Sequence, residues 1–248
     1  MPDEKTAALA AELGAILRLA TPPAGIAFRD REETPGVDPV GLPRPAPTED
    51  GRTGAVAAPC VFWTLGTERV FSTVEADHAD CSVGSYTHGF KRLDEIATKA
   101  DVAALVRSDW VGEADFPHVP AVKDKPGSIV YGPLDALPVP SADVIYLRLS
   151  PKQAMVLDDA LGGVRFEGKP QCHVLAIAKD GGETAISVGC MLSRVRTGMG
   201  NGEMSCAIPA ARLAETVEAL RRNAETERTV AAYAAADASR FTTSDAAS

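Results

Sequence analysis

The sequence has only five cysteines in 248 residues, and aromatic side chains make up 5% of it. So few cysteines, and an odd number of them, argue against the disulfide scaffold that stabilises small secreted domains. No stretch approaches the roughly 18 consecutive apolar residues that a membrane span requires. The N-terminal MPDEKTAALAAELGAILRLA lacks a basic region followed by an uninterrupted apolar run, so it does not resemble a signal peptide. We therefore expect a cytoplasmic protein with reduced thiols.

Positive charge is also scarce, with 25 Lys and Arg against 34 Asp and Glu and a formal net charge of -9. Nucleic acid and anionic lipid both attract proteins with a positive face, so this balance argues against either partner. The sequence contains no G-x-S-x-G, no P-loop and no H-E-x-x-H, the signatures of common hydrolases, phosphate-binding proteins and zinc proteases. A small-molecule substrate or a redox partner protein is the expectation that remains.

A hydrophobic fraction of 45% and a charged fraction of 24% are ordinary for a globular chain. Periodicity and composition predict helices at 4–19, 86–106 (broken at Asp101), 151–161 and 209–233, and strands at 24–28, 70–74, 128–131, 144–149 and 204–208. The run at 60–66 fits either a short helix or a strand. Ser150 and Pro151 form an N-cap and N1 pair for the helix that follows them. The pattern predicts one α/β domain over 1–248, a mixed β-sheet with flanking helices.

Two parts of this domain show no periodicity. Residues 30–58 contain many prolines together with charges and glycines, which predicts a long Pro-rich loop. The last residues, 240–248, are small and polar and are expected to be a disordered tail.

Two segments of the chain follow one pattern: CVFWTLGTERVFSTVEADHADCSVG and CHVLAIAKDGGETAISVGCMLS. Each has a cysteine, an apolar run, a Gly-containing turn with an acidic residue, a second apolar run and another cysteine. Two such half-units, packed about a pseudo-two-fold axis, would bring four cysteines towards one point. These are Cys60, Cys81, Cys172 and Cys190. The alternative is coincidence, because any α/β chain offers similar combinations of cysteines and strands.

Several motifs also resemble one protein family: PPAGIAF at 22–28, EADHADCSVG at 75–84, YGPLDALPVPSADVIYLRLSPKQAM at 131–155 and SVGCMLSRVRTGMGNGEMSCAIP at 187–209. On these residues the chain is similar to the DUF169 family of bacteria and archaea, also called the archaeal Cys-rich (ArCR) family, over about 8–220. The resemblance implies a four-cysteine set at recurring positions, which are Cys60, Cys81, Cys172 and Cys190. It leaves Cys206 outside the set and implies no particular reaction.

Four thiolates that converge in space suit zinc or an iron-sulfur cluster, because soft sulfur ligands prefer these centres. The chain has no C-x-x-C pair, the local spacing that makes either prediction strong. We favour an iron-sulfur cluster (4Fe-4S) over zinc, since the ligands come from separate elements while structural zinc usually pins short knuckles. The predicted metal and cofactor ligands are the four cysteines named above.

Two histidines and two arginines also bear on this site. His78 lies three residues before Cys81 and could be a ligand, a donor to a thiolate, or a base that activates the thiol; the plain alternative is a half-buried histidine. His173 reaches the same site only if the backbone turns beside it. Arg194 or Arg196, in SRVRTGMGNGE, could hold an anionic group, although a tight turn with solvated arginines is the simpler interpretation.

The resulting hypothesis is redox or Lewis-acid chemistry on a small anionic molecule, with His78 and Arg194 as the catalytic residues. Two other functions stay open. The first is a cofactor-free enzyme in which Cys81 or Cys190 is a nucleophile assisted by a histidine. The second is a non-enzymatic metal carrier or sensor whose cysteines exchange an ion.

Overall fold

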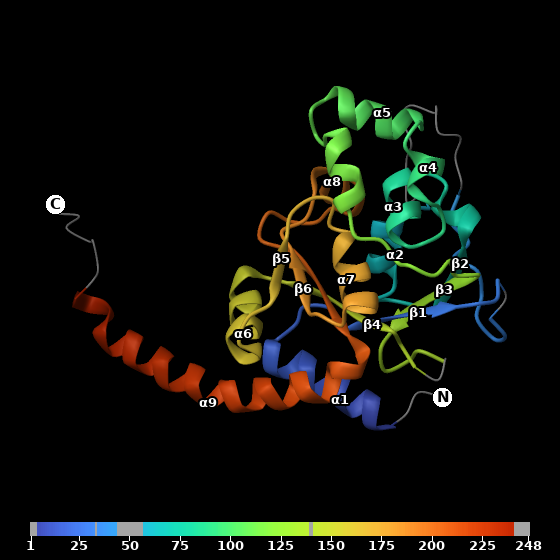
Figure 1. The fold of residues 1–248 in the computed structure, drawn as a ribbon. Helices are drawn as coiled ribbons and strands as arrows, with labels where there is room; N and C mark the ends of the chain where they lie inside the picture. Colours follow the sequence, from blue (N-terminus) through green and yellow to red (C-terminus); the bar gives the residue numbers. More distant parts are fainter. Residues whose placement is uncertain (1–3, 33, 44–56, 139–140, 241–248) are drawn as a thin grey trace.

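The computed structural model describes residues 4–32, 34–43, 57–138 and 141–240. Its strands form one mixed sheet of seven strands in the order β2-β3-β1-β4-β7-β6-β5 (Figure 1). Only β5 and β6 pair in parallel, and the other neighbours are antiparallel. The strands are β1 Ala24–Arg29, β2 Phe71–Val74, β3 Ser128–Pro133, β4 Val144–Leu149, β5 Arg165–Glu167, β6 Ala185–Ser187 and β7 Met204–Pro209. The predicted α/β class is confirmed.

Helices cover both faces of this sheet. One face packs against α2 and α7, and the other packs against α1, α6 and α9. The α-helices are α1 Glu4–Leu17, α2 Pro59–Leu65, α3 Ser82–Thr87, α4 Leu93–Ile96, α5 Ala100–Arg107, α6 Pro151–Leu161, α7 His173–Gly181, α8 Met191–Thr197 and α9 Leu213–Asp237. Short 3-10 helices are η1 Glu75–His78, η2 Glu113–His118, η3 Ala210–Arg212 and η4 Ala238–Arg240. None of the helices in the described part of the chain is long and apolar enough to cross a membrane.

The central strands explain why two separate cores form. Side chains of a strand alternate between its faces. In β4, Val144 and Tyr146 join the aromatic core under α2 and α7, while Ile145 and Leu147 join the aliphatic core under α1, α6 and α9. The four side chains are at most 4% exposed, so β4 is buried on both faces and anchors the centre of the sheet.

The sheet consists of two halves with the same arrangement. Strands β3 and β2 follow outward from β1, and strands β7 and β6 follow outward from β4. Along the chain, β1, α2, β2, α3 and β3 recur as β4, α7, β6, α8 and β7, with α6 and β5 added to the second half. Because β1 and β4 pair antiparallel, a pseudo-two-fold axis normal to the sheet between them relates the halves. The predicted duplication of the cysteine segments therefore agrees with the order of the elements.

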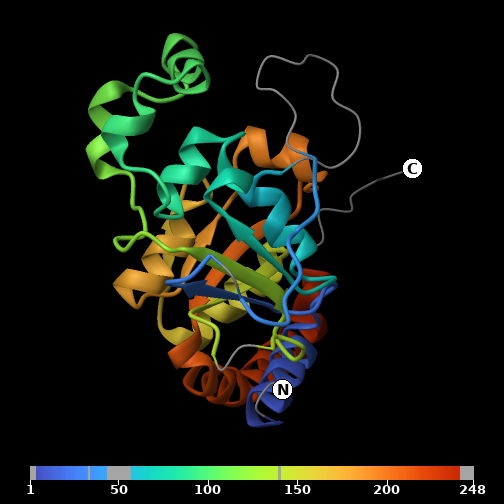
Figure 2. The same cartoon turned by 90° about the vertical axis from the view of Figure 1, so that its right-hand side faces the viewer.

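The segment 86–106, predicted as one helix broken at Asp101, is folded differently. Gly89 adopts a φ of +83°, which ends the helical path soon after α3, and α4 and α5 follow as separate short helices. Asp101 does not interrupt a helix: it lies in the first turn of α5, where its carboxylate accepts hydrogen bonds from Ser82 N at 2.9 Å and Ser82 Oγ at 2.7 Å. Residues 89–119, called the arm below, project from the body beside α3 (Figure 2).

One segment that the sequence left open is a helix, and two predicted irregular segments are described only in part or not at all. The run at 60–66 is helical in α2, where Pro59 occupies the first turn, a position that its fixed φ suits. The described parts of the predicted loop 30–58 contain only turns and one bridge, between Pro39 and Ser72. Residues 44–56 of that loop and 241–248 of the predicted tail lie outside the described residues.

The predicted cap of α6 is confirmed in detail. Ser150 Oγ accepts a hydrogen bond from Gln153 N at 3.3 Å, and Gln153 Oε1 accepts one from Ser150 N at 2.6 Å. We expect Ser150→Ala to lower the free energy of unfolding by about 1 kcal/mol, because a first-turn N–H loses its partner. Urea denaturation measures this, with exposed Ser108→Ala as the control; equal stability of the two variants would contradict the role of the cap.

Candidate cysteine site

Each of the four predicted cysteines stands at the beginning of a helix. Cys60 is the second residue of α2, while Cys81, Cys172 and Cys190 immediately precede α3, α7 and α8 as their N-caps. The first N–H groups of a helix lack partners within the helix and attract negative charge. The N–H of Gly84, in the first turn of α3, donates a hydrogen bond to Cys81 Sγ at 3.4 Å. A thiolate at such a position is stabilised relative to one in a featureless core.

The fold brings these four helix starts into one neighbourhood. Helix α2 packs against α3 and α8, and α3 packs against α7. The pKa of Cys60 is raised to about 11, first by burial and then by the neighbouring Cys81 and Cys190, while Arg196 opposes the rise. Burial also raises the pKa of Cys172 well above its ordinary value, with added contributions from Cys81, Cys190 and Cys60. Each thiol is therefore close enough to at least one other to influence its ionisation.

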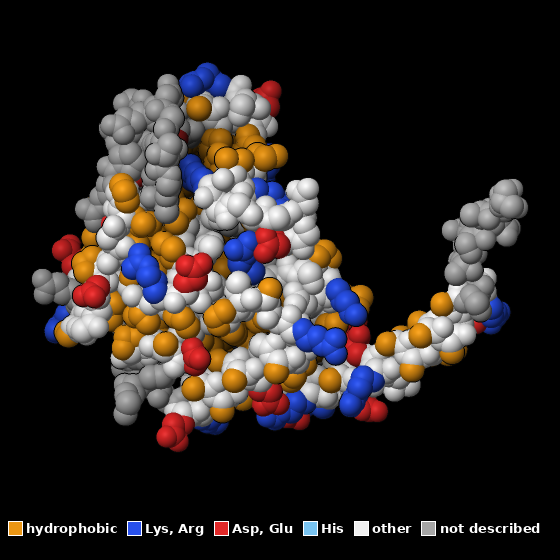
Figure 3. Space-filling model, turned by 180° about the vertical axis from the view of Figure 1, so that it is seen from behind, with side chains coloured by type: hydrophobic (Ala, Val, Ile, Leu, Met, Phe, Trp, Pro, Cys, Tyr) orange, Lys and Arg blue, Asp and Glu red, His pale blue; other side chains and the backbone are white. Residues whose placement is uncertain are grey.

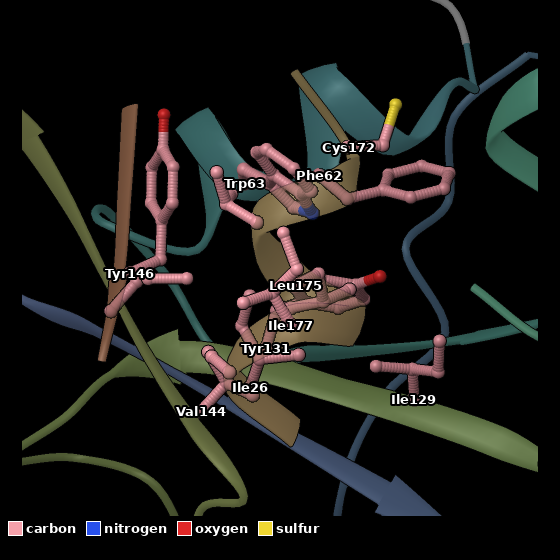
Figure 4. Close-up of a cluster of buried hydrophobic side chains, with 14 of the residues drawn as sticks. Ile26, Phe62, Trp63, Ile129, Tyr131, Val144, Tyr146, Cys172, Leu175 and Ile177 are labelled. Carbon is pink, nitrogen blue, oxygen red and sulfur yellow. The ribbon is translucent and has the colours of Figure 1, made fainter. Parts of the chain in front are cut away.

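All four thiols are buried, at 8% exposure each, and none forms a disulfide. Cys190 Sγ donates to Ser193 Oγ at 3.5 Å, and the side chain of Thr87 forms a hydrogen bond with Cys172. Cys172 lies at the edge of the aromatic core formed with Phe62 and Trp63 (Figure 4). The cysteines thus sit between the sheet-packed core and the helix ends that cover it.

Arg196 is the cation of this neighbourhood. Its guanidinium lies near the sulfurs of Cys81 and Cys60 and interacts with them electrostatically. Burial alone would lower the pKa of Arg196, but the two sulfurs outweigh it and the net pKa is raised. Arg194, the predicted catalytic arginine, instead donates to three backbone carbonyls, those of Val188, Gly200 and Glu203. Of the two arginines weighed from the sequence, Arg196 contacts the thiols and Arg194 holds the loop that follows α8.

Equivalent positions in the two halves of the fold lie close to a cysteine of the opposite half. Thr87 is six residues after Cys81 (87 − 81), and Arg196 is six residues after Cys190 (196 − 190). Each reaches across to the cysteine that begins the first helix of the other half, Cys172 and Cys60 respectively. A neutral hydroxyl on one side thus corresponds to a guanidinium on the other. The site is symmetric in its sulfurs and asymmetric in its charge.

His78, the predicted catalytic histidine, is fully buried. Its Nε2 forms a 3.0 Å hydrogen bond with Thr73 Oγ1, and its ring lies 4.4 Å from Phe90 and 5.0 Å from Phe62 between centroids. Burial, followed by the neighbouring His88, lowers the pKa of His78 well below its ordinary value. The described contacts include no hydrogen bond between His78 and a cysteine, so a direct role at the thiols stays a prediction.

His173, beside Cys172, makes its side-chain contact with an acidic residue. Its Nδ1 approaches Glu167 Oε2 at 3.4 Å, across a short segment that ends at the N-terminus of α7. Burial lowers the pKa of His173, while Glu167 opposes the shift. A role as the base for a cysteine nucleophile gains no support from these contacts.

His88 supports the site, although nothing in the sequence distinguished it. Its Nε2 accepts a 3.1 Å hydrogen bond from Trp63 Nε1, which leaves Nδ1 protonated to donate to the carbonyl of Gly84 at 2.8 Å. The N–H of the same Gly84 donates to Cys81 Sγ. His88 therefore connects the aromatic core to the turn that carries Cys81. The only feature of the sequence that could have indicated His88 is its seven-residue separation from Cys81, and that spacing is common in helical segments.

Burial lowers the pKa of His88 to about 4, from an ordinary 6.5. Between pH 4 and 6.5 this histidine binds a proton in the unfolded chain but stays neutral in the folded protein. The free energy of unfolding must therefore fall as the pH is lowered from 6.5 to 4. The difference between the two values corresponds to a loss of about 3 kcal/mol. Urea denaturation at several pH values measures the loss; His88→Gln should flatten the profile, whereas exposed His118→Gln should not. An unchanged slope in His88→Gln would contradict this assignment.

Cys206, outside the predicted set, lies in the middle of β7. It is fully buried in the aliphatic core with Ile145 and Leu147, on the sheet face opposite α2 and α7. Burial raises its pKa. The sheet therefore separates Cys206 from the other four cysteines.

The described residues contain no group of three or more His, Cys, Asp or Glu side chains arranged to hold a single metal ion. A single tetrahedral ion needs sulfurs about 3.8 Å apart, since metal–sulfur bonds are about 2.3 Å long. A cluster places its thiolate ligands on different iron atoms and accepts sulfurs that stand farther apart. The donor set that the structure describes is four neighbouring thiols with Arg196 and the N–H of Gly84 beside them.

The family model of DUF169, described as uncharacterised ArCR, matches residues 12–219. The chain belongs to the DUF169 family. The match includes all five cysteines of this DUF169 protein and ends within α9. No curated protein and no solved structure matches the chain. The comparisons therefore establish the family and leave the chemistry to the arrangement of the residues.

Proposed function

We propose that this DUF169 protein binds a 4Fe-4S cluster through Cys60, Cys81, Cys172 and Cys190. The observation that carries the proposal is that the fold gathers four buried thiols, each at the start of a different helix, among helices that pack against one another. Sulfur is the ligand that iron-sulfur clusters require.

The residues around the thiols suit an anionic centre. Arg196 contributes one positive charge beside Cys60 and Cys81, and the N–H of Gly84 contributes a hydrogen bond to Cys81 Sγ. Such hydrogen bonds and charges tune the potential of a cluster. When bound, the cluster would supply one-electron transfer or Lewis acidity at an iron atom. Arg196 is also the cation that would attract a small anionic molecule to the site.

The test is anaerobic purification followed by iron, sulfide and zinc analysis and a visible absorption spectrum. We expect iron and acid-labile sulfide close to four of each per chain, with a broad absorption that bleaches on reduction. Stoichiometric zinc without sulfide would replace the cluster with a zinc site. A colourless protein free of iron, even after anaerobic reconstitution with iron and sulfide, would overturn the proposal.

A second function is favoured by one observation, the contacts of Cys81. Its sulfur accepts a hydrogen bond from Gly84 N at 3.4 Å and lies near the guanidinium of Arg196, and a donor and a cation beside the sulfur are the surroundings of nucleophilic cysteines. In that case the metal-free protein would have one thiol that iodoacetamide alkylates rapidly at neutral pH. Mass spectrometry of tryptic peptides would locate it at Cys81. Uniformly slow alkylation of all the cysteines would exclude this function.

A third function, a metal carrier or sensor, differs from a cluster protein in that it exchanges its metal ion reversibly. A carrier would release its metal to a chelator without unfolding and would bind it again, whereas a resident cluster is lost irreversibly in air. The same metal analysis, repeated after dialysis against a chelator, separates the two.

A further inference from the structure

The last long helix runs well beyond the body of the protein. Leu220 is the last buried residue of α9, and the side chain of Asn223 donates to the carbonyl of Val156 in α6 at 3.5 Å. Residues 225–240, the outer part of α9 together with η4, are called the α9 extension below. Figure 1 shows the extension projecting outward past α6. The family match ends at residue 219, before the extension begins.

The α9 extension is apolar where it is most exposed. Residues 230–236 have the sequence VAAYAAA and are all exposed, with Val230 at 58% and Tyr233 at 69%. The alanines explain why this stretch is helical with few tertiary contacts. They do not explain the valine and the tyrosine, which are weaker helix formers and present apolar surface to water. An exposed apolar run of this length marks an interaction surface, and in Figure 3 hydrophobic side chains continue along the projecting helix.

One face of the α9 extension has a symmetric order of side chains. Residues at helical spacing share a face, and the intervals between the members of this face are four, three, one, three and four residues. The members are Glu225, Thr229, Ala232, Tyr233, Ala236 and Arg240. An acid stands at one end, a base stands at the other, and the one large ring lies near the middle among small side chains. Such a face is complementary to a copy of itself that runs in the opposite direction.

Antiparallel pairing of two extensions matches the apolar positions. The register that places Glu225 opposite the partner's Arg240 also places Tyr233 opposite the partner's Ala232. Each large ring then packs on a small side chain, at two places related by a two-fold axis. Parallel pairing in register would instead set Tyr233 against the partner's Tyr233 and Glu225 against the partner's Glu225.

The charges at the two ends of the extension match in the same register. Within one chain, Arg228 pairs with Glu225, and Arg240 pairs with Asp237 at 2.9 Å. The side chains of the two arginines are 75% and 73% exposed, so these surface pairs contribute little by themselves and can also accept a second charged neighbour. In the antiparallel pair, Glu225 faces the partner's Arg240 while Arg228 faces the partner's Asp237. Opposite charges thus alternate at both ends, an arrangement that specifies orientation in paired helices.

We propose that a second copy of this chain covers the α9 extension, through antiparallel pairing of the two extensions, so that the two bodies lie at opposite ends of the paired helices. A partner whose helix carried charge of one sign would match one end of the face and repel the other. A second copy matches both ends. Helix α9 packs on the sheet face opposite α2 and α7, so the pairing leaves the cysteine site of each copy uncovered.

The experiment is sedimentation velocity of the purified full chain over a range of protein concentrations. We expect a dimer, and Tyr233→Glu should raise its dissociation constant at least about tenfold, because the substitution puts two carboxylates near the centre of the paired face. Val195→Glu, at a 77% exposed valine on α8, is the matched control and should keep the wild-type dissociation constant.

A pair of charge reversals tests the direction of the helices. Glu225→Arg alone sets two positive charges opposite each other at both ends of the pair, and Arg240→Glu alone sets two negative charges there. Each variant should therefore dimerise more weakly than the wild type. An equal mixture of the two variants should recover the dimer, because every opposed pair in the mixed dimer again has opposite signs.

Three outcomes would overturn the pairing. One is a wild type that is monomeric at every concentration, and another is a dimer that Tyr233→Glu and both charge variants leave unchanged, since its interface would then lie elsewhere. The third is a mixture of the charge variants that dimerises no better than either variant alone. Far-ultraviolet circular dichroism checks that each variant is folded. None of these measurements depends on iron or sulfide, so the dimer and the proposed cluster can fail independently.

Discussion

Replacing Cys60, Cys81, Cys172 or Cys190 by serine, one at a time, will abolish the bound cluster or reduce the iron and sulfide content to a small fraction. A hydroxyl is a poor ligand for iron compared with a thiolate, and the second-half cysteines cannot compensate for a missing first-half ligand because each begins its own helix. Iron and sulfide analysis of each anaerobically purified variant, with the visible spectrum, measures the loss.

The fifth cysteine provides the matched control. Cys206 is as buried as the others but lies on the opposite face of the sheet, so Cys206→Ala should keep the full iron and sulfide content. Far-ultraviolet circular dichroism checks that each serine variant is folded. Full cluster content in a folded Cys81→Ser or Cys190→Ser variant would show that the centre is held elsewhere.

The second large effect concerns stability. Trp63→Ala should lower the free energy of unfolding by about 3–5 kcal/mol, the usual cost of removing a buried aromatic side chain. Trp63 is 1% exposed, its ring lies 5.1 Å from that of Tyr146, and its Nε1 donates to His88 Nε2. The substitution therefore leaves a cavity and also an unpaired buried nitrogen on His88. Chemical denaturation of the wild type and the variant measures the difference.

Trp110 offers the comparison within the same chain. It lies in the arm, where it lines an apolar hollow and its ring lies 4.9 Å below Lys169 Nζ. A half-buried ring with one cation contact contributes less, and Trp110→Ala should cost about 1–2 kcal/mol. If the two tryptophan variants lost equal stability, the aromatic core under α2 and α7 would not be the main source of stability on that face.

Much of the fold follows from patterns that act over a few residues. The strand at 24–28 and the helix beginning at Pro151 were predicted because an apolar run between breakers and an N-cap with proline have local physical causes. The repeated order of cysteine, apolar run, turn and apolar run predicted two related halves. The structure places that repeat on either side of the β1–β4 pair. A duplicated segment is visible in sequence because both copies must satisfy the same packing.

Other features depend on contacts between distant residues, and the sequence did not predict them. Asp101 was taken for a helix breaker, yet its carboxylate caps a helix 19 residues earlier in the chain. Arg194 and Arg196 were equivalent in sequence, and only the direction of α8 assigns one to carbonyls and the other to sulfurs. His88 had no motif, because its importance comes from Trp63 and Gly84, whose approach requires the tertiary fold.

The duplication also bears on function. A pseudo-two-fold arrangement supplies two cysteines from each half and thus explains how four thiols can come together without a local C-x-x-C pair. The two halves nevertheless differ around the cysteine site. The arm covers α3 while α8 stays exposed, and Thr87 occupies the place that Arg196 has in the other half. One side of the site is closed and neutral, and the other is open and positive.

The most direct test of the central claim is a crystal structure of the anaerobically purified protein with anomalous diffraction measured at the iron absorption edge. The account predicts a single strong iron peak enclosed by the sulfurs of Cys60, Cys81, Cys172 and Cys190, with Arg196 beside it. An iron peak away from these residues, or none in a protein that retains four free thiols there, would contradict it.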